Sequence, residues 1–186
     1  MKTLSFTKFG PGDVLLFLLG PSVVSLAVQM FSRRKLMKEN FLEVAVGTSS
    51  ASFLGVYGTA LFAKVLDIQP ATLKLSTVSR QITSPLAMSM ASMLKADVSI
   101  AVSLVVLTGL LGANFGPSLL NLLKINDPAT RGITIGASSH GLGTAAMNDE
   151  KDAFPFSAIS MALCGTISTV IVAIPATRNA LLAILK

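Results

Sequence analysis

The chain has 186 residues, of which 52% are hydrophobic and only 13% are charged, and its formal net charge is +6. Soluble domains carry about 25% charged residues. The composition therefore excludes a disordered chain, a coiled coil and a nucleic-acid-binding protein, and it disfavours a soluble enzyme. It indicates a protein whose solvent is lipid, with its basic residues grouped between apolar segments.

Four uncharged segments are long enough to cross a bilayer as helices, which takes about 20 residues. They are residues 14–32, 44–63, 98–123 and 154–177. The loop after the first segment is the most basic of the chain, so the positive-inside rule predicts that it faces the cytoplasm or the stroma. Within residues 98–123, Asn114 is expected to hydrogen-bond a neighbouring helix, and Gly109, Gly112 and Gly116 favour close helix packing.

Two further apolar segments, residues 81–94 and 132–148, are too short or too polar to be ordinary spans. Pro85 interrupts the first, and several glycines loosen the second. Irregular backbone at membrane depth is tolerated only inside protein or beside a water-filled cavity. Two such interrupted segments are typical of a transporter's binding site. The sequence therefore predicts an all-α polytopic membrane protein with four full transmembrane helices and two broken or re-entrant helices.

The interrupted segments hold the polar groups best placed to bind a ligand. At the first segment Arg80 offers a cation, and Thr83 and Ser84 offer hydroxyl groups. In the second segment we expect the contributing residues to be Ser138, Ser139, His140, Gly141, Gly143 and Thr144. Exposed helix N-termini at such breaks attract anions. An arginine near the membrane interior is a functional candidate, and histidine is the side chain that most readily exchanges a proton near neutral pH.

Each of these candidates has a structural alternative. Arg80 can instead reach the membrane surface, and His140 can be a packed residue that only stabilises the fold. Arg131 beside Asp127 predicts a loop ion pair, and the charged loop from Asp149 to Asp152 is expected to be solvated. No histidine or cysteine lies at ligand spacing from His140, so we expect no metal and no cofactor. The sequence also lacks a plausible catalytic triad, a P-loop and a dinucleotide fingerprint, which disfavours an enzyme.

Three strings resemble the LrgB/CidB family of membrane proteins. They are DPATRGITIGASSHGLGTAA (residues 127–146), SRQITSPLAMSM (79–90) and LGPSVVSLAVQMF (19–31). The strings TGLLGANF (108–115) and FPFSAISMALCGT (154–166) resemble the plant branch of that family, the plastidal glycolate/glycerate translocators. Proteins of that branch join an LrgA-like half to an LrgB-like half. The resemblance implies that residues 1–186 are a single LrgB-like membrane domain, apparently without its early helices and without an LrgA-like half.

This resemblance implies a secondary carrier of small monocarboxylates. Its substrates would be glycolate and glycerate, moved by alternating access across the plastid inner envelope in photorespiration, with a bacterial-type plasma membrane as the alternative location. Arg80 would then hold the carboxylate, the hydroxyl residues would line the site, and His140 would carry the coupling proton. The expected partners are lipid, the carboxylate substrate and an LrgA-like subunit or half, with a homo-oligomer also considered. The alternatives are an antiholin-like regulator of murein hydrolases and a subunit that transports nothing alone.

Overall fold

The computed structural model describes residues 34–185 without interruption, and before them only positions 17, 21, 24, 28, 31 and 32. The described residues are all helical or irregular, with no strand among them. In chain order the helices are α2 (Arg34–Glu39), α3 (Phe41–Phe53), the π-helix η1 (Leu54–Gly58), α4 (Thr59–Val65), α5 (Ala71–Ser76), the 3₁₀ turn η2 (Thr77–Ser79), α6 (Ser84–Leu94), α7 (Val98–Leu122), α8 (Pro128–Ala146), α9 (Phe154–Ala173) and α10 (Pro175–Leu185).

Three helical runs in the described part of the chain are long and apolar enough to cross a membrane. They are residues 41–65, in which α3, η1 and α4 are continuous, together with α7 and α9. A helix of 25 residues is about 37 Å long, which exceeds the hydrocarbon thickness of about 30 Å. These runs fit an integral membrane protein and overlap three of the four predicted spans. The fourth, residues 14–32, lies outside the described residues except for isolated positions.

The last span ends earlier than the sequence predicts. The uncharged segment suggests a helix to Thr177, but α9 stops at Ala173. Ile174 takes an extended conformation, with φ −73° and ψ 123°, because the ring of the following Pro175 disfavours the helical region for the residue before it. A new helix, α10, then begins at Pro175.

The two short segments fold as helices with irregular ends or centres. Residues 81–94 become an irregular turn followed by α6, whose 11 residues span only about 16 Å and are too short to cross a membrane. Thr83 is extended before α6, and Pro85 lies in its first turn, where a missing N–H costs nothing. Residues 132–148 form most of α8, which is kinked at His140, where φ is 42° and ψ is −137°.

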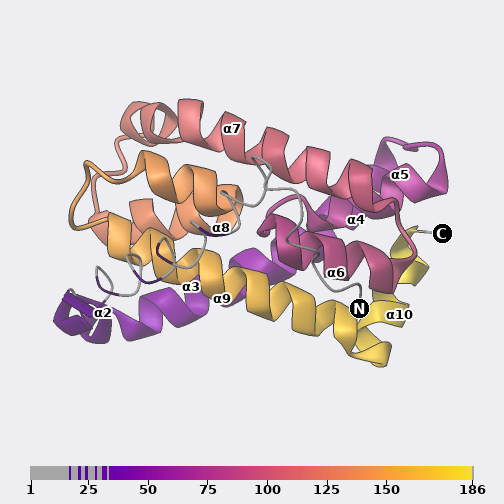
Figure 1. Ribbon diagram of the computed structural model, residues 1–186, viewed down its shortest axis with the longest axis horizontal. Coiled ribbons are helices and arrows are strands. Elements are labelled where there is room, and N and C mark those ends of the chain that lie inside the picture. The colour runs from indigo at the N-terminus through magenta and orange to yellow at the C-terminus, as the bar shows by residue number, and fades with distance from the viewer. Residues whose placement is uncertain are drawn as a thin grey trace.

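Helix α8 lies between α7 and α9 and packs closely against both (Figure 1). Glycine makes this approach possible on the α9 side, since a Cβ at Gly136 would lie 2.1 Å from the Ser157 carbonyl oxygen. On the α7 side, a Cβ at Gly112 would lie 1.8 Å from Ser139 Oγ. The close packing predicted for the α7 glycines is therefore confirmed. The hydrogen bond predicted for Asn114 is wrong, because its Nδ2 donates to the Leu110 carbonyl of its own helix.

Much of the apolar surface of α7 faces outward. Leu107, Leu110, Leu111, Phe115 and Leu122 are all exposed large hydrophobic residues. A contiguous apolar helix face of this kind is unfavourable in water and is the expected lipid-facing surface of a membrane helix.

Candidate functional site

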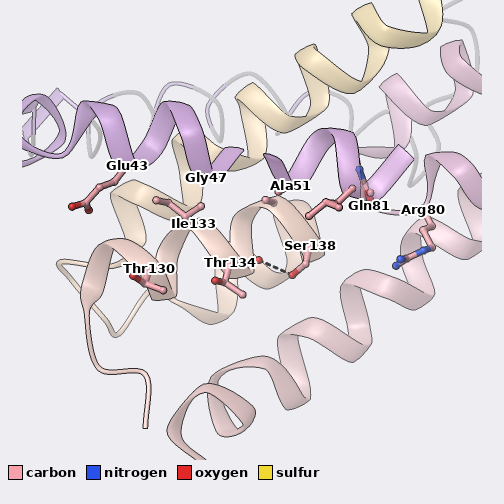
Figure 2. Close-up of a pocket in the computed structure, with 12 residues that line it drawn as sticks. Glu43, Gly47, Ala51, Arg80, Gln81, Thr130, Ile133, Thr134 and Ser138 are labelled. Atoms are coloured by element: carbon pink, nitrogen blue, oxygen red, sulfur yellow. Dashed lines mark hydrogen bonds between the residues drawn. The ribbon is translucent and has the colours of Figure 1, made fainter. Parts of the chain in front are cut away.

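A cavity of about 620 Å³ lies between three parts of the chain (Figure 2). One wall is the α3–η1 helix, a second is the turn that follows η2, and the third is the first half of α8. Its lining residues are Glu43, Gly47, Ala51, Leu54, Gly55, Arg80, Gln81, Thr130, Ile133, Thr134, Ala137 and Ser138. Most of these side chains are small or apolar, and the few polar ones come from all three walls.

The wall formed by α3 and η1 is the first half of a helix long enough to span the membrane. Its lining residues extend from Glu43, in the first turn of the continuous run of residues 41–65, to Gly55 near the centre of that run. The run widens at η1 into a π-helix, a rare feature that is frequent at functional sites. The cavity therefore extends from one end of a spanning helix to its middle.

Arg80 brings a positive charge to this cavity. It lies at the end of the 3₁₀ turn η2 and is half-buried. No carboxylate among the described residues lies within ion-pair distance of it. Glu43 is the other ionisable side chain on the lining, and Figure 2 places the two at opposite ends of the cavity. The guanidinium group extends toward the α8 side, where Ser138 lies.

Ser138 and Ser139 are neighbours in sequence with different surroundings. Ser138 is exposed and lines the cavity, and its hydroxyl donates to the Thr134 carbonyl at 2.7 Å. Ser139 is buried against Gly112 of α7. The two hydroxyl oxygens are 3.1 Å apart. Of these two serines, Ser138 is therefore the one whose hydroxyl group a ligand in the cavity can reach, beside the lining hydroxyls of Thr130 and Thr134.

His140 is buried at the interface of α8 with α7 and does not line the cavity. Its Nε2 lies 2.8 Å from the carbonyl oxygen of Val105. The ring fits because α7 has a glycine at position 109, where a Cβ would lie 2.5 Å from His140 Cε1. Nδ1 makes no hydrogen bond to any described residue. The structure thus gives His140 a packing contact and leaves one ring nitrogen available for a proton.

The remaining predicted site residues lie elsewhere. Thr144 is buried, with its Oγ1 2.9 Å from Ser157 Oγ of α9. Gly143 packs against Ser139, and Gly141 is exposed, both in α8 beyond the kink. Thr83 and Ser84 begin α6, and Thr83 makes no capping hydrogen bond through its side chain. Of the nine predicted residues, the structure brings Arg80 and Ser138 together on one cavity.

Gln81 is the most buried of the polar lining residues that the sequence did not predict, which also include Glu43, Thr130 and Thr134. Its side chain is buried, with 5% exposure, and its Nε2 has no hydrogen-bond partner among the described residues. A signal was present, because Gln81 directly follows Arg80 in an interrupted segment. Only the folded chain, however, shows that its amide faces the helix run 41–65.

A network of side chains fixes the start of α8. The guanidinium of Arg131 donates to both carboxylate oxygens of Glu150, at 2.7 and 2.5 Å. Its third nitrogen donates to Asn121 Oδ1 and to the Ile125 carbonyl. The predicted Arg131–Asp127 pair is therefore wrong, and so is the expectation that Glu150 is simply solvated. Asp127 instead caps α8 by accepting from Thr130.

No cluster of three or more metal-ligating side chains occurs among the described residues. The cavity offers a cation, a neutral amide and hydroxyl groups, and it carries the carboxylate of Glu43 at the end opposite Arg80. The groups at the Arg80 end suit a small anion with further oxygen atoms.

Comparison with known proteins gives the family. The LrgB-like family model matches residues 5–177. Plastidal glycolate/glycerate translocator 1 of Arabidopsis thaliana is 39% identical over 177 residues, which are 94% of this chain and 34% of the plant protein. The uncharacterized protein YwbG of Bacillus subtilis is 31% identical over 86% of this chain and 66% of its own length. The antiholin-like protein LrgB of Bacillus subtilis is 22% identical over 72% of this chain and 58% of its own length.

No solved structure matches the chain significantly. The chain spans about a third of the plant relative and less than two thirds of the two bacterial ones. Because the family model covers nearly all of the 186 residues, the chain belongs to the LrgB-like family.

Proposed function

We propose that the chain forms all or part of a secondary transporter of small monocarboxylates, with the cavity described above as the substrate site. The observation that carries this proposal is Arg80, a half-buried cation on the cavity without a carboxylate partner among the described residues. A guanidinium group binds a carboxylate through two parallel hydrogen bonds. A substrate carboxylate supplies the partner that the described part of the chain does not.

The place of the cavity supports transport rather than simple anion binding. Carriers bind substrate near the bilayer midplane, beside interrupted helices. The cavity reaches from the first turn of residues 41–65 to their centre, and its other walls are Arg80 and Gln81 of the irregular turn after η2 and the first half of the kinked helix α8. We propose that α6 and α8 are the broken helices at which the site opens alternately to the two sides.

Glycolate and glycerate are the proposed substrates, because the Arabidopsis relative is named as their plastidal translocator. By the same relationship we propose the plastid inner envelope as the location, with a bacterial-type plasma membrane as the alternative. His140 is proposed to carry the coupling proton on Nδ1, since its Nε2 is held by Val105. The other predicted site residues do not line this cavity, and we propose that they contact the substrate in another conformation of the carrier. They are Thr83, Ser84, Ser139, Gly141, Gly143 and Thr144.

A second candidate is an antiholin-like membrane protein, because one relative carries that name. Such a protein would act through assembly in the membrane and would have no need of an unpaired arginine on a cavity. A third candidate is a subunit that needs an LrgA-like partner or half to transport.

The deciding experiment is uptake of labelled glycolate into proteoliposomes that contain the full chain, with and without an added LrgA-like half. Saturable uptake that unlabelled glycerate competes supports the carrier. Uptake only with the added half identifies the chain as a subunit. Leakage of large solutes, with no saturable uptake in either preparation, contradicts the carrier and favours the antiholin-like function.

A further inference from the structure

We infer that Gln81 is a second substrate-binding residue, whose side-chain amide hydrogen-bonds a hydroxyl group next to the carboxylate that Arg80 holds. The inference rests on the proposed function, and it assigns the distinction between hydroxymonocarboxylates and other monocarboxylates to one side chain. It also makes Gln81, with Gly55 beneath it, the determinant of that specificity.

The first observation is an unmet hydrogen bond. Gln81 is only 5% exposed, it lines the cavity, and its Nε2 has no partner among the described residues. A buried donor without an acceptor is unfavourable, and native structures contain few of them. Because Gln81 lines the cavity, a rotation of its buried amide brings the nitrogen to a ligand that enters, and the ligand can supply the missing oxygen.

The second observation is that the amide lies against Gly55, in space that a side chain at that position would fill. A Cβ at Gly55 would lie 1.8 Å from Gln81 Oε1, 1.9 Å from Nε2 and 2.1 Å from Cδ. Any residue other than glycine at position 55 therefore displaces the amide. Gly55 belongs to the π-helix η1, so the local widening of the spanning helix and the missing side chain both occur where the amide rests.

The third observation is the arrangement of the two polar side chains. Arg80 and Gln81 are consecutive, and both line the cavity. Figure 2 shows that they diverge, with Gln81 directed toward the α3–η1 helix and Arg80 toward α8. A ligand that contacts both needs a carboxylate at one point and a neutral polar oxygen at another. A hydroxyl group both donates and accepts, which matches an amide that does the same.

The test is a binding experiment on the purified full chain in detergent. Labelled glycolate is displaced by unlabelled glycolate, glycerate or acetate, because acetate has the carboxylate but no hydroxyl group. We expect glycolate to bind about tenfold more tightly than acetate, a difference of about 1.4 kcal/mol. In Gln81→Met, which keeps the length of the side chain but has no amide, this ratio should fall to about twofold or less, with acetate affinity nearly unchanged.

Gly55→Ala should lower the ratio in the same way without touching the amide chemically. The displaced atoms are the far end of a flexible side chain, so the protein can still fold. Two matched controls should keep the wild-type ratio. Gly58→Ala changes a glycine of the same π-helix that has nothing within 4 Å of an added Cβ. Thr59→Val removes a buried hydroxyl group that, like the Gln81 amide nitrogen, has no hydrogen-bond partner in the described part of the chain, but Thr59 does not line the cavity.

The outcomes separate the two proposals. If Gln81→Met and Gly55→Ala both keep the wild-type ratio, the amide is not a binding group and this inference is wrong, while the transporter proposal stands. If the wild type binds glycolate and acetate with equal affinity, this inference is also wrong and the transporter proposal again stands. If the wild-type chain binds neither acid, the cavity is not a monocarboxylate site, and the proposed site and this inference both fail. Retained acetate binding in each variant shows that it is folded.

Discussion

His140 of α8 donates its Nε2 proton to the carbonyl oxygen of Val105 in α7 over 2.8 Å. Because a backbone carbonyl only accepts, this contact fixes the protonated nitrogen of the neutral ring. The backbone of His140 has φ 42° and ψ −137°, a region that residues other than glycine seldom adopt. The break in α8 is therefore held by a side chain that contacts the neighbouring helix, at some cost in backbone strain.

This geometry predicts an order of stability at position 140. His140→Ala leaves the Val105 carbonyl without its side-chain donor and retains the strained backbone, so we expect a loss of about 1–3 kcal/mol in the free energy of unfolding. His140→Gly loses the same hydrogen bond but tolerates the positive φ, so it should be more stable than the alanine variant by about 0.5–1 kcal/mol. Unfolding in detergent measures both. If the glycine variant is less stable than the alanine variant, the backbone at position 140 is not strained.

The proposed proton role of His140 makes a separate prediction. Histidine is the side chain that most readily exchanges a proton near neutral pH, so uptake coupled to a proton on Nδ1 should depend on pH. His140→Gln can still donate to Val105 but does not titrate. We expect it to transport with a flattened pH profile in proteoliposomes. If its profile matches that of the wild type, His140 has only a structural role.

Arg80 should contribute more to carboxylate binding than any other cation of the chain. Hydrogen bonds to charged groups contribute about 1.5–3 kcal/mol, so Arg80→Gln should weaken glycolate binding by about 10- to 100-fold. Arg80→Lys keeps the charge but loses the planar fork, and we expect an intermediate affinity. Lys95→Gln removes an exposed charge at the end of α6 that does not line the cavity. Equal losses in Arg80→Gln and Lys95→Gln would indicate a general charge effect and not a binding contact.

The Arg131–Glu150 pair should couple the start of α8 to the loop before α9. The pair has two hydrogen bonds, and the side-chain exposures are 8% and 34%. Buried charged hydrogen bonds contribute about 1.5–3 kcal/mol, but exposed ion pairs contribute less than about 1. We therefore expect a coupling energy of about 1–2 kcal/mol in a double-mutant cycle of Arg131→Met and Glu150→Gln. The same cycle with the exposed Asp149→Asn should give a value near zero.

Asp127 should make the stability of α8 depend on acid pH. Its carboxylate accepts from the Thr130 hydroxyl and backbone N–H, and these bonds, the hydroxyl first, lower the pKa of Asp127 from its usual value. A lowered pKa means that the stabilisation is fully present above about pH 4 and is lost as the pH falls through the folded-state value. Asp127→Ala should cost about 1 kcal/mol at neutral pH. Asp127→Asn retains a cap and should lose the acid dependence. An acid dependence that persists in Asp127→Asn would assign it to another group.

The spans were predictable because they depend on local composition. Residues 98–123 and 154–177 are uncharged and apolar along their length, and α7 and α9 occupy most of these two segments. The errors have local causes as well. Pro175 ends α9 early through its effect on Ile174, a rule that the sequence already contained. The partner of Arg131 was wrong because the nearest carboxylate in sequence, Asp127, is committed to capping α8.

The site was predictable only in part. Interrupted segments pointed to Arg80 and Ser138, and both line the cavity. The same argument grouped Ser138 with His140, although the kink and the turn of the helix direct them to different neighbours. The local sequence marks Gln81 only by its place directly after Arg80 in an interrupted segment. Its amide is defined by contact with Gly55, 26 positions earlier in the chain.

The sequence alone determined that this chain is helical, that its solvent is lipid and where its helices are interrupted. These properties follow from composition and from the spacing of charges, glycine and proline, which are all features of residues close in sequence. The tertiary structure decided which polar groups share a cavity and which are buried between helices, where they contact other protein groups. That outcome depends on how closely helices approach at glycine positions and on which carbonyl or carboxylate each donor meets. Those distances join residues far apart in the chain, and they exist only after α3, α7, α8 and α9 have packed together.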